Sequence, residues 1–179
     1  MSNPHYIFKI IIAGDTGVGK TSLVRRYVDN EFIPAKKATI GIDYFLKNVS
    51  LEGLSENEGI ALQIWDLAGE EKYRTFLPSY IPGTQGMFLV YSADVKNSFN
   101  YMHGFMNVLN SLLKSKIPII LVKAKSDLHE ELTDQETKDN FMKNYGIDIF
   151  LDTSARTGHN VNETFIELAK LIAKENKLL

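Results

Sequence analysis

Cysteine is absent from the 179-residue sequence. A chain without cysteine can form neither a disulfide framework nor a cysteine-ligated metal site, and it has no residue to prenylate or palmitoylate. Proline is scarce, with five residues, and no apolar run approaches the length of a transmembrane helix. We therefore expect a cytoplasmic protein with no membrane anchor within these 179 residues.

Net charge is also nearly absent, because 20 basic side chains face 22 acidic ones and leave a formal charge of −2. The lysines and arginines are scattered rather than gathered in a stripe, so no nucleic-acid surface is expected. A hydrophobic content of 44% is that of an ordinary globular protein, and the length suits one full core. These values predict a single domain over residues 1–179, present as a monomer.

Strand-like and helix-like segments alternate along the chain. Apolar runs predict buried strands, and 3.6-residue periodicity predicts helices between them. Two further strands, Ile42–Leu51 and Gly59–Leu67, are joined by a short turn and predict one hairpin. The pattern predicts an α/β fold: a six-stranded, mainly parallel sheet with one antiparallel edge strand and helices on both faces. The other predicted strands are Tyr6–Ala13, Met87–Ala93, Ile117–Val122 and Ile147–Leu151, and the predicted helices are Thr21–Asp29, Ser98–Lys114, Thr133–Tyr145 (with a Thr133/Glu136 capping box) and Asn160–Asn176.

The segment Gly14–Thr21 has the pattern G-x-x-x-x-G-K-[ST], between a strand and a helix. This is the phosphate-binding P-loop, in which glycines let successive backbone N–H groups face one anion. The following helix adds the positive end of its dipole, Lys20 adds a mobile charge, and the Thr21 hydroxyl can ligate Mg²⁺. We expect a phosphate site formed by Asp15, Thr16, Gly17, Val18, Gly19, Lys20, Thr21 and Ser22.

Two further polar positions follow or precede predicted strands. Asp66 ends an apolar strand and can hold the water shell of a metal, and Gly69 lets a backbone N–H approach a terminal phosphate. Thr39 lies in a loop that could bring its hydroxyl to Mg²⁺ when the last phosphate is present. The predicted metal site therefore consists of Thr21, Thr39 and Asp66.

The last two polar clusters are Lys125-Ser126-Asp127 and Ser154-Ala155-Arg156, each after a predicted strand. In parallel sheets ligands bind at this carboxyl edge. A carboxylate there can accept two hydrogen bonds from the N1–H and the exocyclic amine of guanine, an edge that adenine lacks. Asp127 is therefore the candidate for base selectivity, because leaving its buried partner unpaired typically costs several kcal/mol.

These five motifs occur in the order and spacing of a Ras-superfamily GTPase, and the chain resembles its Rab branch from about Phe8 to Ile172. The closest likeness lies in residues 38–49 (ATIGIDYFLKNV), 65–94 (WDLAGEEKYRTFLPSYIPGTQGMFLVYSAD) and 152–165 (DTSARTGHNVNETF). The resemblance implies a P-loop switch that binds GDP or GTP with Mg²⁺, hydrolyses GTP, and recruits effectors in vesicle trafficking.

The resemblance also implies residue roles. Phe32 would cover the guanine, Lys125 and Asp127 would face the base, and the Ala155 backbone, between Ser154 and Arg156, would meet the base carbonyl oxygen. The loops Glu31–Gly41 and Ala68–Gly83 would meet effectors, exchange factors and activating proteins. Tyr44, Trp65 and Tyr80 would form the aromatic triad of an effector surface; ordinary packing between the two loops is the alternative interpretation.

Three positions depart from the family pattern. Ala124 stands where the base-recognition motif has Asn, which suggests a loss of about 1–3 kcal/mol in nucleotide affinity. Glu70 replaces the Gln that positions attacking water; an ionised Glu accepts hydrogen bonds but cannot donate them. Thr16 replaces a glycine of Ras and is a milder change. With Glu70 and Lys20 as the catalytic candidates, we expect slow hydrolysis, although Glu70 acting as a base would have the opposite effect.

Two other interpretations remain open, the first of them motivated by Ala124 and Glu70. One is a pseudo-GTPase, an interaction module with weak nucleotide binding or no cycling. The other is an ATP-using P-loop protein, against which Asp127, Phe32 and Ser154 argue. Rab-like proteins use C-terminal prenylated cysteines, and the sequence ends at Leu179 without one. Either a lipidated tail would follow and direct the protein to intracellular membranes, or the protein works without a lipid.

Overall fold

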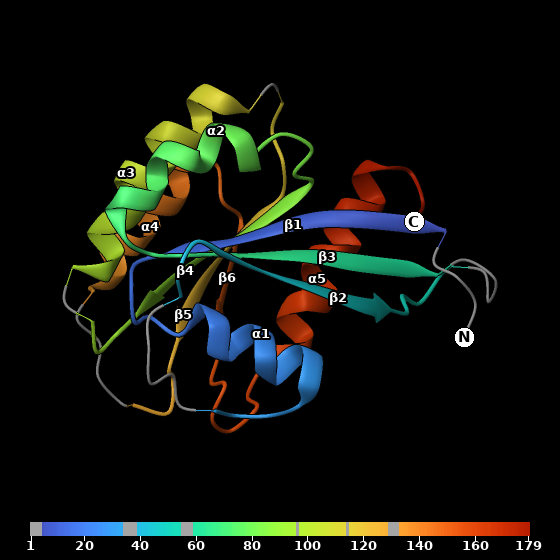
Figure 1. The fold of residues 1–179 in the computed structure, drawn as a ribbon, viewed down its shortest axis with the longest axis horizontal. Helices are drawn as coiled ribbons and strands as arrows, with labels where there is room; N and C mark the ends of the chain where they lie inside the picture. The colour runs from blue at the N-terminus through green and yellow to red at the C-terminus, as the bar shows by residue number, and fades with distance from the viewer. Residues whose placement is uncertain (1–4, 34–38, 55–58, 96, 114, 129–132) are drawn as a thin grey trace.

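The chain folds around a six-stranded sheet with the strand order β2-β3-β1-β4-β5-β6 (Figure 1). The coordinates are a computed structural model that describes residues 5–33, 39–54, 59–95, 97–113, 115–128 and 133–179. β2 pairs antiparallel with β3, and every other neighbouring pair is parallel. This confirms the predicted sheet with one antiparallel edge strand. The strands are β1 Tyr6–Gly14, β2 Ile42–Val49, β3 Ile60–Leu67, β4 Gly86–Ser92, β5 Ile119–Ala124 and β6 Ile149–Asp152.

Helices cover both faces of the sheet, as predicted (Figure 1). On one face lie α1 and α5, and on the other lie α2, α3 and α4. Along the central strands successive side chains enter opposite cores: Ile10 and Ile12 pack towards α1 and α5, whereas Ile11 packs towards α3. Strands buried on both faces explain the uninterrupted apolar runs. The helices are α1 Lys20–Asp29, α2 Leu77–Tyr80, α3 Ser98–Leu112, α4 Gln135–Tyr145 and α5 Val161–Glu175.

Two local predictions were wrong. Residues 68–83, expected to be a loop, contain a short 3₁₀-helix η1 (Glu71–Phe76) that continues into α2, with Pro78 in the first turn. A proline fits there because the first-turn N–H groups have no partner within the helix. The N-cap of α4 is Asp134 rather than Thr133, and its carboxylate accepts a 2.8 Å hydrogen bond from the Thr137 backbone N–H.

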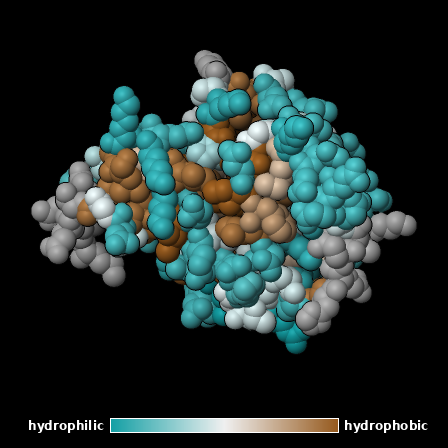
Figure 2. Space-filling model, turned by 180° about the vertical axis from the view of Figure 1, so that it is seen from behind, coloured by the Kyte–Doolittle hydropathy of each residue, from teal (hydrophilic) through white to brown (hydrophobic). Residues whose placement is uncertain are grey.

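β6 is the edge strand opposite β2, and its four residues are all half-buried. Seen from behind, brown apolar side chains form a band across the centre of the molecule, framed by hydrophilic surface (Figure 2). Within the described part of the chain, none of the helices has both the length and the apolar character needed to span a bilayer.

Candidate nucleotide site

The P-loop is the turn between β1 and α1, at the carboxyl edge of the sheet. Gly17 and Gly19 have φ values of 79° and 105°, in the left-handed region that side chains other than glycine rarely adopt. Gly19 is the N-cap of α1, and the helix begins at Lys20. Because glycine has no side chain, the cap accepts no hydrogen bond from the first N–H groups of the helix. These donors and the helix dipole point to an anion-binding turn.

The Lys20 side chain is 6% exposed and lies inside this turn. Its Nζ donates hydrogen bonds of 2.8 Å to the carbonyl oxygens of Gly14 and Asp15. Burial lowers the pKa of Lys20 to about 8, although the negative charges of Asp66 and Asp15 oppose this shift. A phosphate beside the amine would act in the same direction as those carboxylates and favour the charged form.

Three oxygen-bearing side chains meet beside Lys20. The Thr21 and Thr39 hydroxyl oxygens lie 2.8 Å apart, and the Thr21 hydroxyl also donates to Oδ2 of Asp66. Asp66 is fully buried, and burial raises its pKa to about 6. Its Oδ1 has no hydrogen-bond partner among the described residues. Because Mg²⁺ prefers carboxylate, hydroxyl and water oxygens, this donor set with its unsatisfied carboxylate oxygen fits Mg²⁺.

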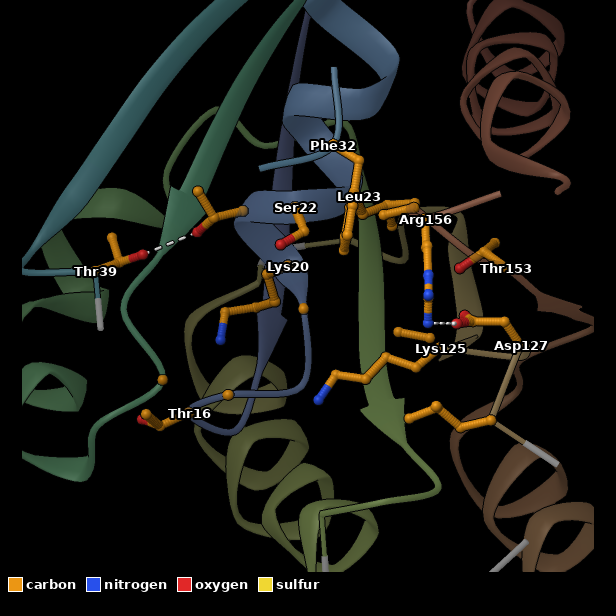
Figure 3. Close-up of a pocket in the computed structure, with 17 residues that line it drawn as sticks. Thr16, Lys20, Ser22, Leu23, Phe32, Thr39, Lys125, Asp127, Thr153 and Arg156 are labelled. Carbon is orange, nitrogen blue, oxygen red and sulfur yellow. Dashed lines mark hydrogen bonds and ion pairs between the residues drawn. The ribbon is translucent and has the colours of Figure 1, made fainter. Parts of the chain in front are cut away.

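A cavity of about 650 Å³ extends from the P-loop to the loops after β5 and β6. Figure 3 shows Thr39, Lys20 and Thr16 on one side, Asp127 and Thr153 on the other, and Phe32 and Arg156 between them. Thus most of the predicted phosphate and base residues face one space. The lining residues are Thr16, Gly17, Gly19, Lys20, Thr21, Ser22, Leu23, Phe32, Thr39, Gly69, Ala124, Lys125, Asp127, Leu128, Thr153, Ala155 and Arg156.

The far end of the cavity is organised around Asp127. The buried Ser154 hydroxyl donates a 2.6 Å hydrogen bond to Oδ1 of Asp127. The Arg156 guanidinium lies 3.9 Å from the other carboxylate oxygen, a longer ion pair in which the arginine side chain is largely exposed. One side of the carboxylate is therefore held by the protein while the residue still lines the cavity.

Arg26 on α1 supports this end of the site and was missed by the sequence reasoning. Its Nε donates to the Ala155 carbonyl oxygen at 2.6 Å, and its Nη2 donates to the Arg156 carbonyl oxygen at 2.8 Å. The loop after β6 is thereby fastened to the helix that begins at the P-loop. An arginine on an amphipathic helix gives no sequence signal of such a role.

Some predicted site residues lie outside the cavity. The Val18 side chain is fully buried in the core, and the Asp15 carboxylate accepts a 2.7 Å hydrogen bond from the Thr16 backbone N–H. Glu70 forms a 2.6 Å ion pair with Lys72 and is not among the lining residues.

Glycine fits position 69 because the P-loop backbone lies too close to leave room for a side chain. A Cβ there would lie 2.3 Å from the Thr16 backbone nitrogen, so the segment after β3 contacts the P-loop directly. In the loop Glu31–Gly41, residues 34–38 lie outside the described residues.

The three predicted aromatic residues are in contact. Tyr44 and Trp65 meet edge to face at 6.1 Å between ring centroids, and Trp65 and Tyr80 are tilted at the same distance. Tyr44 is 54% exposed, and the Lys9 ammonium lies 4.3 Å from the centre of the Trp65 ring. The triad thus forms one continuous surface across β2, β3 and α2.

Comparison with known proteins agrees with this geometry. The family model described as Ras family matches residues 9–174. The chain belongs to the Ras family. It is 37% identical to the Ras-related protein Rab-1D of Dictyostelium discoideum over 92% of this chain and 79% of that protein. It is 36% identical to the Ras-related protein SEC4 of Saccharomyces cerevisiae over 97% of this chain and 80% of that protein.

These identities confirm the Rab branch of the Ras superfamily. The sheet and its helices are the Ras-type α/β fold, and this is a family of GTPases. This chain has a buried P-loop lysine and an Asp127 carboxylate held by Ser154. Ala124 and Glu70 stand at two of the positions where the sequence differs from the family pattern.

Proposed function

We propose that the protein is a guanine-nucleotide switch that binds GDP and GTP with Mg²⁺, hydrolyses GTP slowly, and recruits effectors in vesicle trafficking. The observation that carries the proposal is the single cavity of about 650 Å³ that joins Lys20 to Asp127. A cationic amine beside open helix N–H groups suits phosphates, and a carboxylate at the other end suits the donor edge of guanine. Adenine presents no matching pair of donors to that carboxylate.

The oxygen cluster beside Lys20 supports a Mg²⁺-dependent switch. Thr21 and Thr39 would ligate the ion, and Asp66 would accept hydrogen bonds from its water shell. When bound, Mg²⁺ neutralises part of the phosphate charge. Because Thr39 belongs to the loop before β2, its contact with Thr21 couples that loop to the occupancy of the site.

Slow hydrolysis is supported by the state of Glu70. In hydrolysis a water oxygen bonds to the γ-phosphorus, the bond to the leaving GDP oxygen breaks, and the water gives up a proton. Glu70 could accept that proton but cannot donate a hydrogen bond to the phosphoryl oxygens while ionised. Its pairing with Lys72, away from the cavity lining, further favours a low intrinsic rate.

The effector role is supported by the contact between Tyr44, Trp65 and Tyr80, of which Tyr44 is exposed and the other two are half-buried, next to the Thr39 loop and η1. Both adjoining segments contact the P-loop region, through Thr39 and through Gly69. A partner that binds this surface would therefore sense the nucleotide. The proposed location is the cytoplasm; intracellular membranes would be reached if a lipidated tail follows.

Equilibrium binding of fluorescent GDP and of a non-hydrolysable GTP analogue, with and without Mg²⁺ and with ATP as competitor, tests the switch. We expect Mg²⁺-dependent binding that ATP does not displace and that Lys20→Met abolishes. Lys170→Met, on the half-buried face of α5, is the matched control for loss of a lysine charge. Displacement by ATP, or binding that survives Lys20→Met, would overturn the proposal.

Ala124 favours a second candidate, an interaction module that holds nucleotide weakly. Its buried methyl group lines the cavity and offers no hydrogen bond to a base. Binding weaker than about 1 µM, roughly −8 kcal/mol, would favour this candidate over the cycling switch.

A further inference from the structure

Asp94, in the turn after β4, contacts a residue of the cavity wall although it does not itself line the cavity. Its Oδ2 lies 2.8 Å from Nζ of Lys125. Its other carboxylate oxygen accepts a hydrogen bond from the Ser92 hydroxyl. Both oxygens are therefore used, and the carboxylate has a defined orientation beside the site.

Lys125 has an unusual backbone conformation for a lysine. Its φ of 59° lies in the left-handed region, which aims its side chain across the cavity (Figure 3). The methylene stem passes close to the P-loop, with Cε 3.8 Å and Cγ 4.0 Å from the position that a Cβ on Gly19 would occupy. The stem is thus part of the wall between the phosphate end and the base end.

Ala124 leaves this part of the wall without a hydrogen-bonding side chain. Its methyl group lies 3.9 Å from the same hypothetical Cβ position on Gly19 and carries no hydrogen-bonding atom. A lysine has four rotatable side-chain bonds, so its stem remains in one place only when its end is held. Among the described residues, the Lys125 ammonium forms its ion pair with Asp94.

The turn that presents Asp94 is itself anchored to α3. The Ser98 hydroxyl donates a 3.0 Å hydrogen bond to the Ser92 carbonyl oxygen and accepts one of 3.2 Å from the Ser92 N–H. Burial alone would raise the pKa of Asp94, but hydrogen bonds from Lys125 and Ser92 outweigh it and hold the pKa below its ordinary value. The charged carboxylate is therefore favoured at neutral pH.

We propose that Asp94 is a positioning residue of the base pocket, which fixes the Lys125 ammonium so that the lysine stem forms a stable wall against the bound nucleotide. This inference rests on the proposed nucleotide-binding function. In this chain Asp94 constrains the wall of the base pocket, which the Ala124 methyl group cannot do by hydrogen bonding. The side chains of Asp94 and Lys125 are 30% and 31% exposed. Solvent therefore screens their ion pair, and its effect on nucleotide binding is modest.

The test is the dissociation rate of fluorescent GDP after addition of excess unlabelled GDP, measured for the wild-type protein, Asp94→Asn, Lys125→Met and the double variant. We expect Asp94→Asn to release GDP about two- to fivefold faster, the range for a part-exposed ion pair. In the Lys125→Met background, Asp94→Asn should have no further effect, because the ammonium on which it acts is gone. Asp139→Asn, on the exposed face of α4, controls for the loss of one carboxylate.

Melting temperatures of all variants separate positioning from a general structural role. A structural role would lower the melting temperature and accelerate release equally in both backgrounds, which would overturn the inference. An Asp94→Asn rate equal to wild type would overturn it as well. If the wild-type protein itself fails to bind GDP, the proposed function fails and the inference with it, and this outcome is recognised without any variant.

Discussion

The Ser154 hydroxyl donates a 2.6 Å hydrogen bond to the Asp127 carboxylate and so joins the loops that follow β5 and β6. Ser154 is 1% exposed, so neither water nor another side chain easily replaces it. A hydrogen bond to a charged group is worth more than one between neutral groups, and this one also sets the direction of the carboxylate. It links the fold to the residue proposed to recognise the base.

Replacing Ser154 by Ala should weaken GDP binding by about tenfold, which corresponds to roughly 1.4 kcal/mol for a lost hydrogen bond to a carboxylate. The preference for GTP over ATP should fall with it. Equilibrium titration with fluorescent GDP and competing ATP measures both. Ser111→Ala, at an exposed position of α3, is the control, and equal affinities for the two variants would contradict the prediction.

Replacing Ala124 by Asn should strengthen nucleotide binding by about tenfold to a hundredfold, or 1–3 kcal/mol. The reason is that the amide adds donors and an acceptor at a buried position lining the cavity, next to Lys125. Ala124→Val, which adds bulk but no polar group, is the control. A gain shared by both variants, or absent from Ala124→Asn, would show that hydrogen bonding at this position does not limit affinity.

Replacing Glu70 by Gln should raise the single-turnover rate of GTP hydrolysis by about tenfold or more, a barrier change of at least roughly 1.4 kcal/mol. The amide removes a negative charge that would oppose the triphosphate, gains a donor, and no longer forms the ion pair with Lys72. Glu71→Gln, which breaks the neighbouring 3.2 Å pair with Arg74, is the control. A slower variant would instead identify Glu70 as the base.

The N-cap of α4 should make stability depend on pH in acid. The backbone N–H and the hydroxyl of Thr137 bind the Asp134 carboxylate and lower its pKa below the ordinary 3.8. A lowered folded-state pKa gives stabilisation that is present above pH 3.8 and is lost as the pH falls through the lowered value. The melting temperature of the wild type should exceed that of Asp134→Asn at pH 7, and the gap should close in acid. A gap independent of pH would contradict this assignment.

Replacing Gly104 by Ala should stabilise the protein by about 0.5–1 kcal/mol, because glycine is unfavourable within a helix such as α3. The new Cβ would lie 3.2 Å from Nη1 of Arg74, the far end of a flexible side chain that stacks on Tyr101. A small shift of Arg74 would accommodate it. Urea unfolding measures the change, and destabilisation would show that Arg74 is rigidly held on α3.

The sequence by itself determined the P-loop and the order of strands and helices. The P-loop is contiguous, so glycine, lysine and threonine at fixed spacing already imply its geometry, and the apolar runs imply the doubly covered sheet. The cap of α4 was predicted at Thr133, one residue before the observed Asp134, and the short helices in residues 68–83 were not predicted. There Pro78 and polar residues suggest a loop, while contacts with the apolar core around Leu77 and Ile81 hold helical turns in place.

Only the tertiary structure decided which distant side chains support one another. Ser154 reaches Asp127 across 27 residues, Lys125 reaches Asp94 across 31, and Arg26 reaches Ala155 across 129. Each partner stands near the carboxyl edge of a strand or on a helix next to that edge. Sequence patterns carry side-chain chemistry and local periodicity but no distances between separate strands, so such pairs appear only once the sheet brings its strand ends together.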